Sequence, residues 1–159
     1  GTREEVGRMT DAQLYPDLLH FYARQLRLLD DGDVDAWAAT FTPDGILRQA
    51  HRTTARKGRA DIAAGLRRAS ETLRARGAVC RHWVGNLTIE RTADTLHTRF
   101  YSLVIESTPE TPAHLHLSTD IRDELLPVDN TWQIRDRTII HDPDPVPPWL
   151  TDPLRQDAI

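Results

Sequence analysis

The sequence has a single cysteine, no long apolar stretch and almost no excess of one charge, and each of these features narrows what the protein can be. Cys80 alone excludes an intramolecular disulfide and a zinc site built from several cysteines. No apolar run approaches the ~20 residues that span a bilayer, and residues 1–10 lack the apolar core of a signal peptide. We therefore expect a soluble, cytoplasmic protein.

The net charge limits the kinds of partner that we expect, and the length limits the number of domains. The 159 residues carry 24 acidic and 20 basic side chains, a formal net charge of -4, so nothing in the composition attracts nucleic acid or an anionic membrane. The length suits one domain with a real core. We expect a single domain over residues 1–159, with its core at about 12–141. The proline-rich tail at 142–159 would cover either a pocket or a dimer partner through Trp149 and Leu150.

The N-terminal part of the chain has the periodicity of helices. Apolar residues recur every three or four positions over residues 14–29, which predicts a first helix. Gly32 breaks the pattern, and a short second helix follows with Phe41 in its apolar stripe. Pro43-Asp44-Gly45 then predicts a stop and a turn. Asp30 lies at the corner between the two helices, where its carboxylate can point inward.

The rest of the chain predicts one more helix and a run of strands. A short strand at 46–50 and a polar loop at 51–57 precede a helix at 58–75. From residue 79 the apolar period changes to two, with turn signals such as Ala93-Asp94, and this predicts strands at 79–91, 96–107, 113–126 and 131–141. Helices followed by antiparallel strands indicate an α+β fold. We expect a cone-shaped barrel in which a curved antiparallel sheet wraps around the N-terminal helices and encloses a pocket.

Histidines occur at two places where a side chain could reach such a pocket. His114 and His116 share one face of a predicted strand, but the opposite face is more apolar and makes the better pocket wall. We therefore expect both to be exposed or at an interface. Their spacing can chelate a metal ion, yet the sequence offers no third ligand that we can place nearby, so we expect no metal site. His82 alternates with the apolar Trp83, and this pattern alone predicts His82 on the outer face.

Four motifs in order resemble the nuclear transport factor 2 superfamily. They are the corner LDDGDVDAWAATFTPDG, the helix start GRADI, the strand RHWVGNLTIE and the closing strand WQIRDRTI. Within the superfamily, the chain is most similar to SnoaL-like and scytalone-dehydratase-like proteins over about residues 12–141. The resemblance implies the cone-shaped fold, and it implies that the strand face carrying His82 lines the cavity.

The same resemblance implies a catalytic pair. Matching motif to motif places the family's aspartate at Asp30 and its histidine at His82. A neutral imidazole, with an unperturbed pKa of ~6.5, can accept a proton at physiological pH. A carboxylate bonded to its other nitrogen fixes the tautomer and stabilises the imidazolium. General-base assistance of this kind is worth ~10²- to 10⁴-fold in rate.

We therefore interpret the chain as a cofactor-independent lyase or cyclase, either a dehydratase or a ring-forming cyclase. Its substrate would be a small polyketide-like or other cyclic secondary metabolite. Scytalone dehydratase carries tyrosines where this sequence has Leu29 and Gln49, which argues against that enzyme's own reaction. The candidate contacts to substrate oxygens are Tyr101, Gln49 and Asn86, and those at the mouth of an apolar pocket are Trp37 and Phe41.

The sequence alone also allows two functions that involve no catalysis by this chain. The cavity can hold a molecule without catalysis, as a small-molecule-binding or assembly module. The chain can also be the small subunit of a ring-hydroxylating oxygenase, which has this fold and no catalytic pair of its own. In every case the open sheet face predicts a homodimer or a higher homo-oligomer.

Overall fold

The structure is a computed structural model that describes residue 5, residue 7 and residues 9–92 and 95–145. Its helices are α2 (Asp11–Asp30), α3 (Val34–Ala38) and α4 (Arg59–Ala75), and its strands are β1 (Phe41–Gln49), β2 (Arg56–Lys57), β3 (Val79–Arg91), β4 (Leu96–Ser107), β5 (His114–Val128) and β6 (Thr131–His141). The turn expected at Ala93-Asp94 and the anchors Trp149 and Leu150 lie outside the described residues. None of the helices in the described ranges has the length and apolarity needed to cross a membrane.

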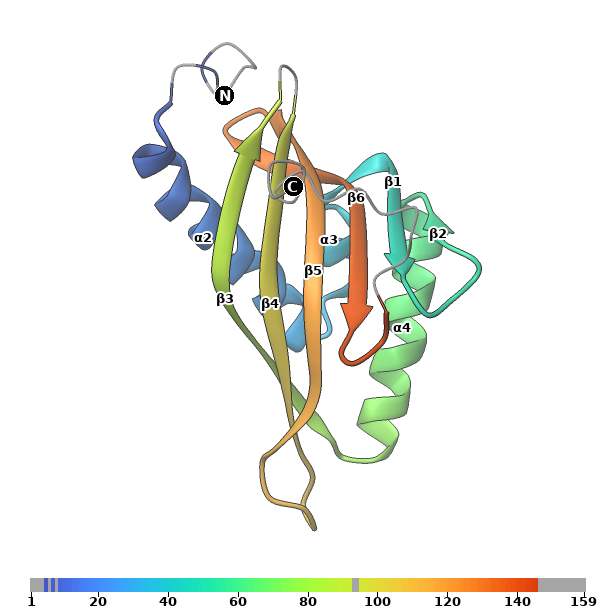
Figure 1. The fold of residues 1–159 in the computed structure, drawn as a ribbon. Coiled ribbons are helices and arrows are strands. Elements are labelled where there is room, and N and C mark those ends of the chain that lie inside the picture. Colours follow the sequence, from blue (N-terminus) through green and yellow to red (C-terminus); the bar gives the residue numbers. More distant parts are fainter. Residues whose placement is uncertain (1–4, 6, 8, 93–94, 146–159) are drawn as a thin grey trace.

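The strands form one curved sheet in the order β2-β1-β6-β5-β4-β3, with the helices on one side of it (Figure 1). The α+β fold predicted from the sequence is confirmed. The sheet remains open, because β2 and β3 are edge strands that do not pair with each other. One pairing differs from the prediction of a wholly antiparallel sheet, since β1 runs parallel to β6. These two strands are far apart in the chain, so no hairpin forces them to be antiparallel.

The end of α2 is fixed by a glycine cap. Gly32 has a left-handed φ of +71°, and the N–H groups of Gly32 and Asp33 donate to the carbonyls of Leu29 and Leu28. This pair of bonds is the Schellman motif, which satisfies carbonyl groups that the end of a helix leaves free. It turns the chain sharply after Asp30, the last residue of the helix.

Strand β1 begins earlier than the sequence predicts. Phe41, expected in the second helix, is the first residue of the strand, and Pro43-Asp44-Gly45 lie within it. The pairing with β6 is irregular between Phe41 and Ile46. A Cβ atom on Gly45 would lie only 2.9 Å from the Cβ of Phe41. The turn-type residues therefore form an irregularity inside a strand, where glycine permits a close approach of the backbone.

The core between the helices and the sheet contains a polar cluster as well as apolar side chains. The hydroxyl of Tyr22 donates to Asp123 Oδ2 at 2.8 Å. Arg137 donates two hydrogen bonds of 2.8 Å to the same carboxylate. Burial, and then the charge of Asp123, raise the pKa of Tyr22, so its hydroxyl stays protonated and remains a donor. The largest fully buried apolar side chains of the core include Leu14, Leu18, Phe41, Ile62, Phe100 and Ile134.

Candidate active site

A cavity of about 690 Å³ lies between the helices and the inner face of the sheet. Its walls come from the end of α2, from α3 and α4, and from all six strands of the sheet. The volume falls in the range of ~300–1,000 Å³ that is typical of small-molecule sites.

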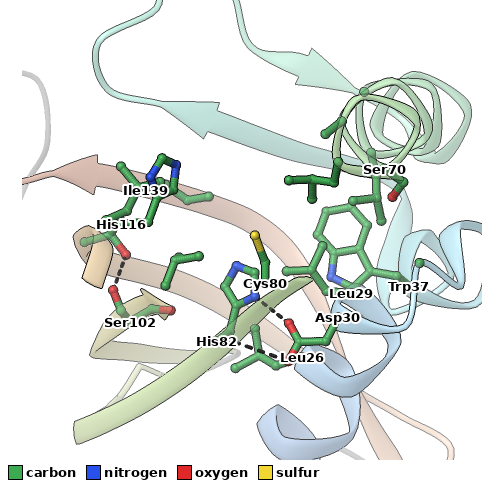
Figure 2. A pocket seen from close by; sticks show the side chains of 18 of the residues that line it. Leu26, Leu29, Asp30, Trp37, Ser70, Cys80, His82, Ser102, His116 and Ile139 are labelled. Atoms are coloured by element: carbon green, nitrogen blue, oxygen red, sulfur yellow. Dashed lines mark hydrogen bonds and ion pairs between the residues drawn. The ribbon is translucent and has the colours of Figure 1, made fainter. Parts of the chain in front are cut away.

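The cavity wall brings Asp30 and His82 together (Figure 2). Asp30 Oδ1 lies 2.6 Å from His82 Nδ1, and Asp30 Oδ2 accepts a hydrogen bond of 3.3 Å from the backbone N–H of His82. The two side chains are only 10% and 19% exposed. In the neutral imidazole, a proton on Nδ1 that is donated to the carboxylate leaves the lone pair on Nε2.

Two local features direct this pair toward the cavity. The glycine cap of α2 sets the direction of the chain directly after Asp30. On β3, His82 pairs with the buried Val104, so both lie on the inner face of the sheet. Trp83 lies on the outer face and is 71% exposed. The outward placement of His82 predicted from alternation alone is therefore wrong, because the outer face of this strand carries the more apolar residues.

Two of the predicted substrate contacts, Gln49 and Trp37, also line the cavity. Trp37 Nε1 is buried and has no hydrogen-bond partner within the described part of the chain. The same holds there for Oγ of Ser102, a cavity residue that the sequence did not single out. A buried polar atom without a partner costs ~1–3 kcal/mol. Both residues belong to the cavity wall, and neither of these atoms is bonded to another described residue.

Three predicted contacts lie away from the cavity lining. Tyr101 is on the outer face of β4 and is 49% exposed, because both of its neighbours in the strand are directed inward. Asn86 is exposed in an irregular part of β3, where its φ is 57°. Phe41 is fully buried in the core, with its ring centroid 5.1 Å from that of Trp37. These placements correct the prediction that all three meet a substrate.

Glu106 is a cavity residue that the sequence did not predict. Its side chain is 5% exposed, and Oε1 accepts a hydrogen bond of 2.7 Å from Arg76. This bond lowers the pKa of Glu106, so the group is a carboxylate at neutral pH. On its other side, the thiol of Cys80 lies 3.8 Å from Oε2, and burial raises the pKa of that thiol. An acidic residue at the end of the apolar run 103–105 is the one signal in the sequence that could have indicated it.

His116 also lines the cavity, although alternation predicts it on the opposite face from the pocket. The register of β4 and β5 shifts here, since Val104 pairs with Leu117 while Ile105 pairs with Leu115. His116 is therefore an extra residue in β5. One extra residue exchanges the two faces of a strand beyond it, and apolar alternation does not reveal where this happens.

The chain is similar to a known family of proteins and to several solved structures. A family model described as SnoaL-like domain matches residues 11–138. Aln2 from a Streptomyces species is 30% identical, with a TM-score of 0.76 over 85% of this chain and 95% of Aln2. A protein from Catenulispora acidiphila in complex with S-DNPA is 29% identical, with a TM-score of 0.73 over 83% of this chain and 96% of that one.

A more distant structure shares the fold. A putative scytalone dehydratase from Novosphingobium aromaticivorans is 21% identical, with a TM-score of 0.69 over 84% of this chain and 88% of that protein. A search of curated proteins gives no match.

Proposed function

The chain belongs to the family of SnoaL-like domain proteins, and from this premise we propose that it is a cofactor-independent lyase or cyclase of small, cyclic, polyketide-like metabolites. The observation that carries the proposal is the 2.6 Å contact between Asp30 and His82 in the wall of a cavity of ligand size. A binding module or a structural subunit has no need of this pair, because holding a molecule requires no proton transfer. The geometry therefore favours catalysis over those two alternatives.

In the proposed reaction, His82 removes a proton next to a substrate carbonyl. The C–H bond breaks, its electron pair moves into the enolate, and the proton goes to Nε2 of His82. Asp30, bonded to Nδ1, holds the ring in position and stabilises the imidazolium that forms. The pair is largely buried, and the reduced access of water strengthens the attraction between the two opposite charges.

The second half of the reaction returns the proton. In dehydration, the imidazolium gives it to a β-hydroxyl group, the C–O bond breaks and water leaves as the double bond forms. In ring closure, His82 instead takes the proton of a substrate hydroxyl while its oxygen adds to an activated double bond. The carbon that becomes nucleophilic then receives the proton from His82. Both routes balance without a cofactor and use the same two side chains.

The cavity wall offers both polar and apolar contacts for such a substrate. Ser102 Oγ and Trp37 Nε1 are buried and unpartnered within the described residues, and they would hydrogen-bond substrate oxygens together with Gln49. Leu26 and Leu29 from α2 contribute apolar surface to the same wall (Figure 2). The related protein from Catenulispora acidiphila is known in complex with S-DNPA, which supports a small-molecule ligand for this chain as well.

The test is turnover of a panel of cyclic polyketide intermediates by the wild-type protein, Asp30→Asn and His82→Ala. Product mass distinguishes the loss of one water from an isomer of unchanged mass. We expect kcat to fall ~10²- to 10⁴-fold in each variant, with little change in the thermal unfolding midpoint. His20→Ala is the matched control, because His20 is an exposed imidazole on α2 outside the cavity lining.

Two results would contradict the proposal. Full turnover by both Asp30→Asn and His82→Ala on a confirmed substrate would remove the pair from the reaction. Ligand-induced stabilisation that is equal in all four proteins, with no product from any of them, would instead identify a binding module.

A further inference from the structure

A second polar cluster lies at the end of the sheet where β4 ends and β5 begins. One ligand atom from each of Glu106, His114 and His116 lies within 4.8 Å of the other two. Two imidazoles and one carboxylate are a donor set that proteins use for zinc. We propose that these three residues bind a divalent transition-metal ion, with Zn²⁺ as the natural occupant.

The register of the sheet explains how three residues from two strands converge. Glu106 on β4 pairs directly with His114 on β5. The extra residue in β5 near this point is His116, and its Nε2 lies 3.9 Å from Glu106 Oε2. The sequence shows a His-x-His spacing without a third ligand. The neighbouring strand supplies that ligand through a pairing that only the structure reveals.

The distances require a small contraction when a metal ion enters. Zinc bonds nitrogen and oxygen at about 2.0–2.2 Å, which places the ligand atoms of a tetrahedral site about 3.3 Å apart. In the present structure the ligand atoms lie within 4.8 Å of one another, and His116 Nε2 is 3.9 Å from Glu106 Oε2. Glu106 is buried and fixed, but His114 and His116 are exposed. A shift of the two exposed rings can therefore close the gap without moving the core.

Two of the three ligands already have an outer hydrogen-bond partner of the kind that metal ligands use. His114 Nδ1 donates to the carbonyl of Pro112 at 3.2 Å, which leaves the other ring nitrogen with a free lone pair. Arg76 bonds Glu106 Oε1 at 2.7 Å and leaves Oε2 facing His116. Such partners orient the ligands of a metal.

The charge of Arg76 limits the strength of the site. Its guanidinium repels a cation held by the same carboxylate, although the Arg76 side chain is 51% exposed and water screens its charge. We therefore expect reversible binding that is weaker than in a closed structural zinc site.

A three-residue site of this kind keeps coordination positions open. Glu106 and His116 line the same cavity as His82, so an oxygen atom of a bound ligand can reach an open position. A metal ion there would polarise the substrate carbonyl whose neighbouring carbon His82 deprotonates, and it would assist this step without being required for it. This last consequence rests on the proposed function, whereas metal binding itself does not.

The experiment is isothermal titration of the chelator-treated, untagged protein with ZnCl₂, and a parallel titration with Co²⁺ followed by visible absorption. We expect one site in the wild-type protein. Glu106→Gln, His114→Ala and His116→Ala should each weaken binding at least ~10-fold. His51→Ala is the matched control, because His51 also lies beside a second histidine, with its ring centroid 4.7 Å from that of His141. It should leave the affinity unchanged.

The outcomes separate this proposal from the proposed function. Equal affinity of the wild-type protein and the three ligand variants, or no binding to the wild type, would overturn the metal site and leave the Asp30–His82 chemistry intact. His82→Ala should keep wild-type affinity for Zn²⁺ even where turnover is lost. Because His114 is exposed, His114→Ala remains informative if the buried Glu106→Gln fails to fold.

Discussion

At the scale of single residues, Ser102 allows a role in ligand binding to be separated from a role in folding. Its hydroxyl is buried and bonds nothing within the described residues, so Ser102→Ala removes no protein hydrogen bond. We expect the free energy of unfolding to stay constant or rise by up to ~1 kcal/mol, while KM rises ~2- to 10-fold because one hydrogen bond to substrate is lost. Urea unfolding and steady-state kinetics measure these two quantities.

The control for Ser102 is Ser118→Ala. The hydroxyl of Ser118 donates to Asp142 at 2.8 Å and lies outside the cavity lining, so KM should not change. If Ser102→Ala left KM unchanged but lowered the free energy of unfolding, Ser102 would stabilise the fold and would not bind the ligand.

The buried ion pair of Arg137 and Asp123 leads to a second prediction, which concerns the stability of the fold. Their side chains are 2% and 0% exposed, so Arg137→Met leaves a carboxylate buried without its counterion. We expect the free energy of unfolding to fall by ~3–5 kcal/mol. Replacing Asp123 with leucine in the same protein should recover much of this loss, because no buried charge then remains. Urea denaturation of Arg137→Met, Asp123→Leu and the double variant gives the free energies of unfolding for a double-mutant cycle. A double variant as unstable as Arg137→Met would contradict this account.

Among the elements, the C-terminal cap of α2 connects the fold to the site. Gly32 has a φ of +71°, and a Cβ there would meet only Ser70 Oγ at 3.8 Å. Gly32→Ala therefore acts through the backbone conformation and not through a clash. We expect it to reduce the free energy of unfolding by ~1–2 kcal/mol and to lower kcat, because Asp30 lies two residues before the cap.

The matched variant for this cap is Gly32→Asn. Asparagine adopts the left-handed conformation more easily than alanine, so both stability and kcat should lie between those of the wild type and Gly32→Ala. Thermal unfolding and turnover provide the comparison. Equal losses in the two variants would show that the side chain at this position matters more than the backbone.

The long elements were predictable because their signals are long. An apolar period of two extends over each of the four long strands, and the structure confirms them from residue 79 onward. The predictions that are wrong concern short segments. Turn-type residues at 43–45 lie inside β1, and one extra residue in β5 brings His116 to the cavity. The first depends on pairing with β6, far along the chain, and the second on the register of the hairpin between β4 and β5. Apolar alternation within one strand encodes neither.

The candidate site was predictable to a similar degree. Asp30 follows from the helix corner, but the placement of His82 comes from family resemblance, because alternation predicts the opposite face. Tyr101 was a poor choice for a physical reason: tyrosine suits both a pocket and an exposed sheet face. The sequence marks Glu106 only as an acidic residue after the apolar run 103–105, and its place in the cavity follows from the register of β3, β4 and β5.

At the scale of the whole molecule, the outer face of the sheet carries exposed apolar residues. Those on β3 are the reason that apolar alternation predicts His82 on the outer face. Trp83 is 71% exposed and Leu115 is 60% exposed, and Tyr101 is also exposed on this face. Exposed apolar groups of this kind mark interaction surfaces. In a two-fold symmetric dimer the same patch meets its own copy, so we expect the chain to form a homodimer through this face, burying ~800 Å² per partner.

Trp83→Glu tests this expectation, because it would place two carboxylates close to each other in a symmetric apolar contact. We expect the variant to be a monomer by sedimentation equilibrium, and the concentration dependence of its unfolding midpoint to disappear with the dimer. Tyr15→Glu is the control, since Tyr15 is another exposed aromatic residue but lies on α2, away from this face. A wild-type protein that stays monomeric across a dilution series would contradict the dimer. If Trp83→Glu instead remained dimeric, the copies would have to meet elsewhere, and the edge strands β2 and β3 would be the next surfaces to alter.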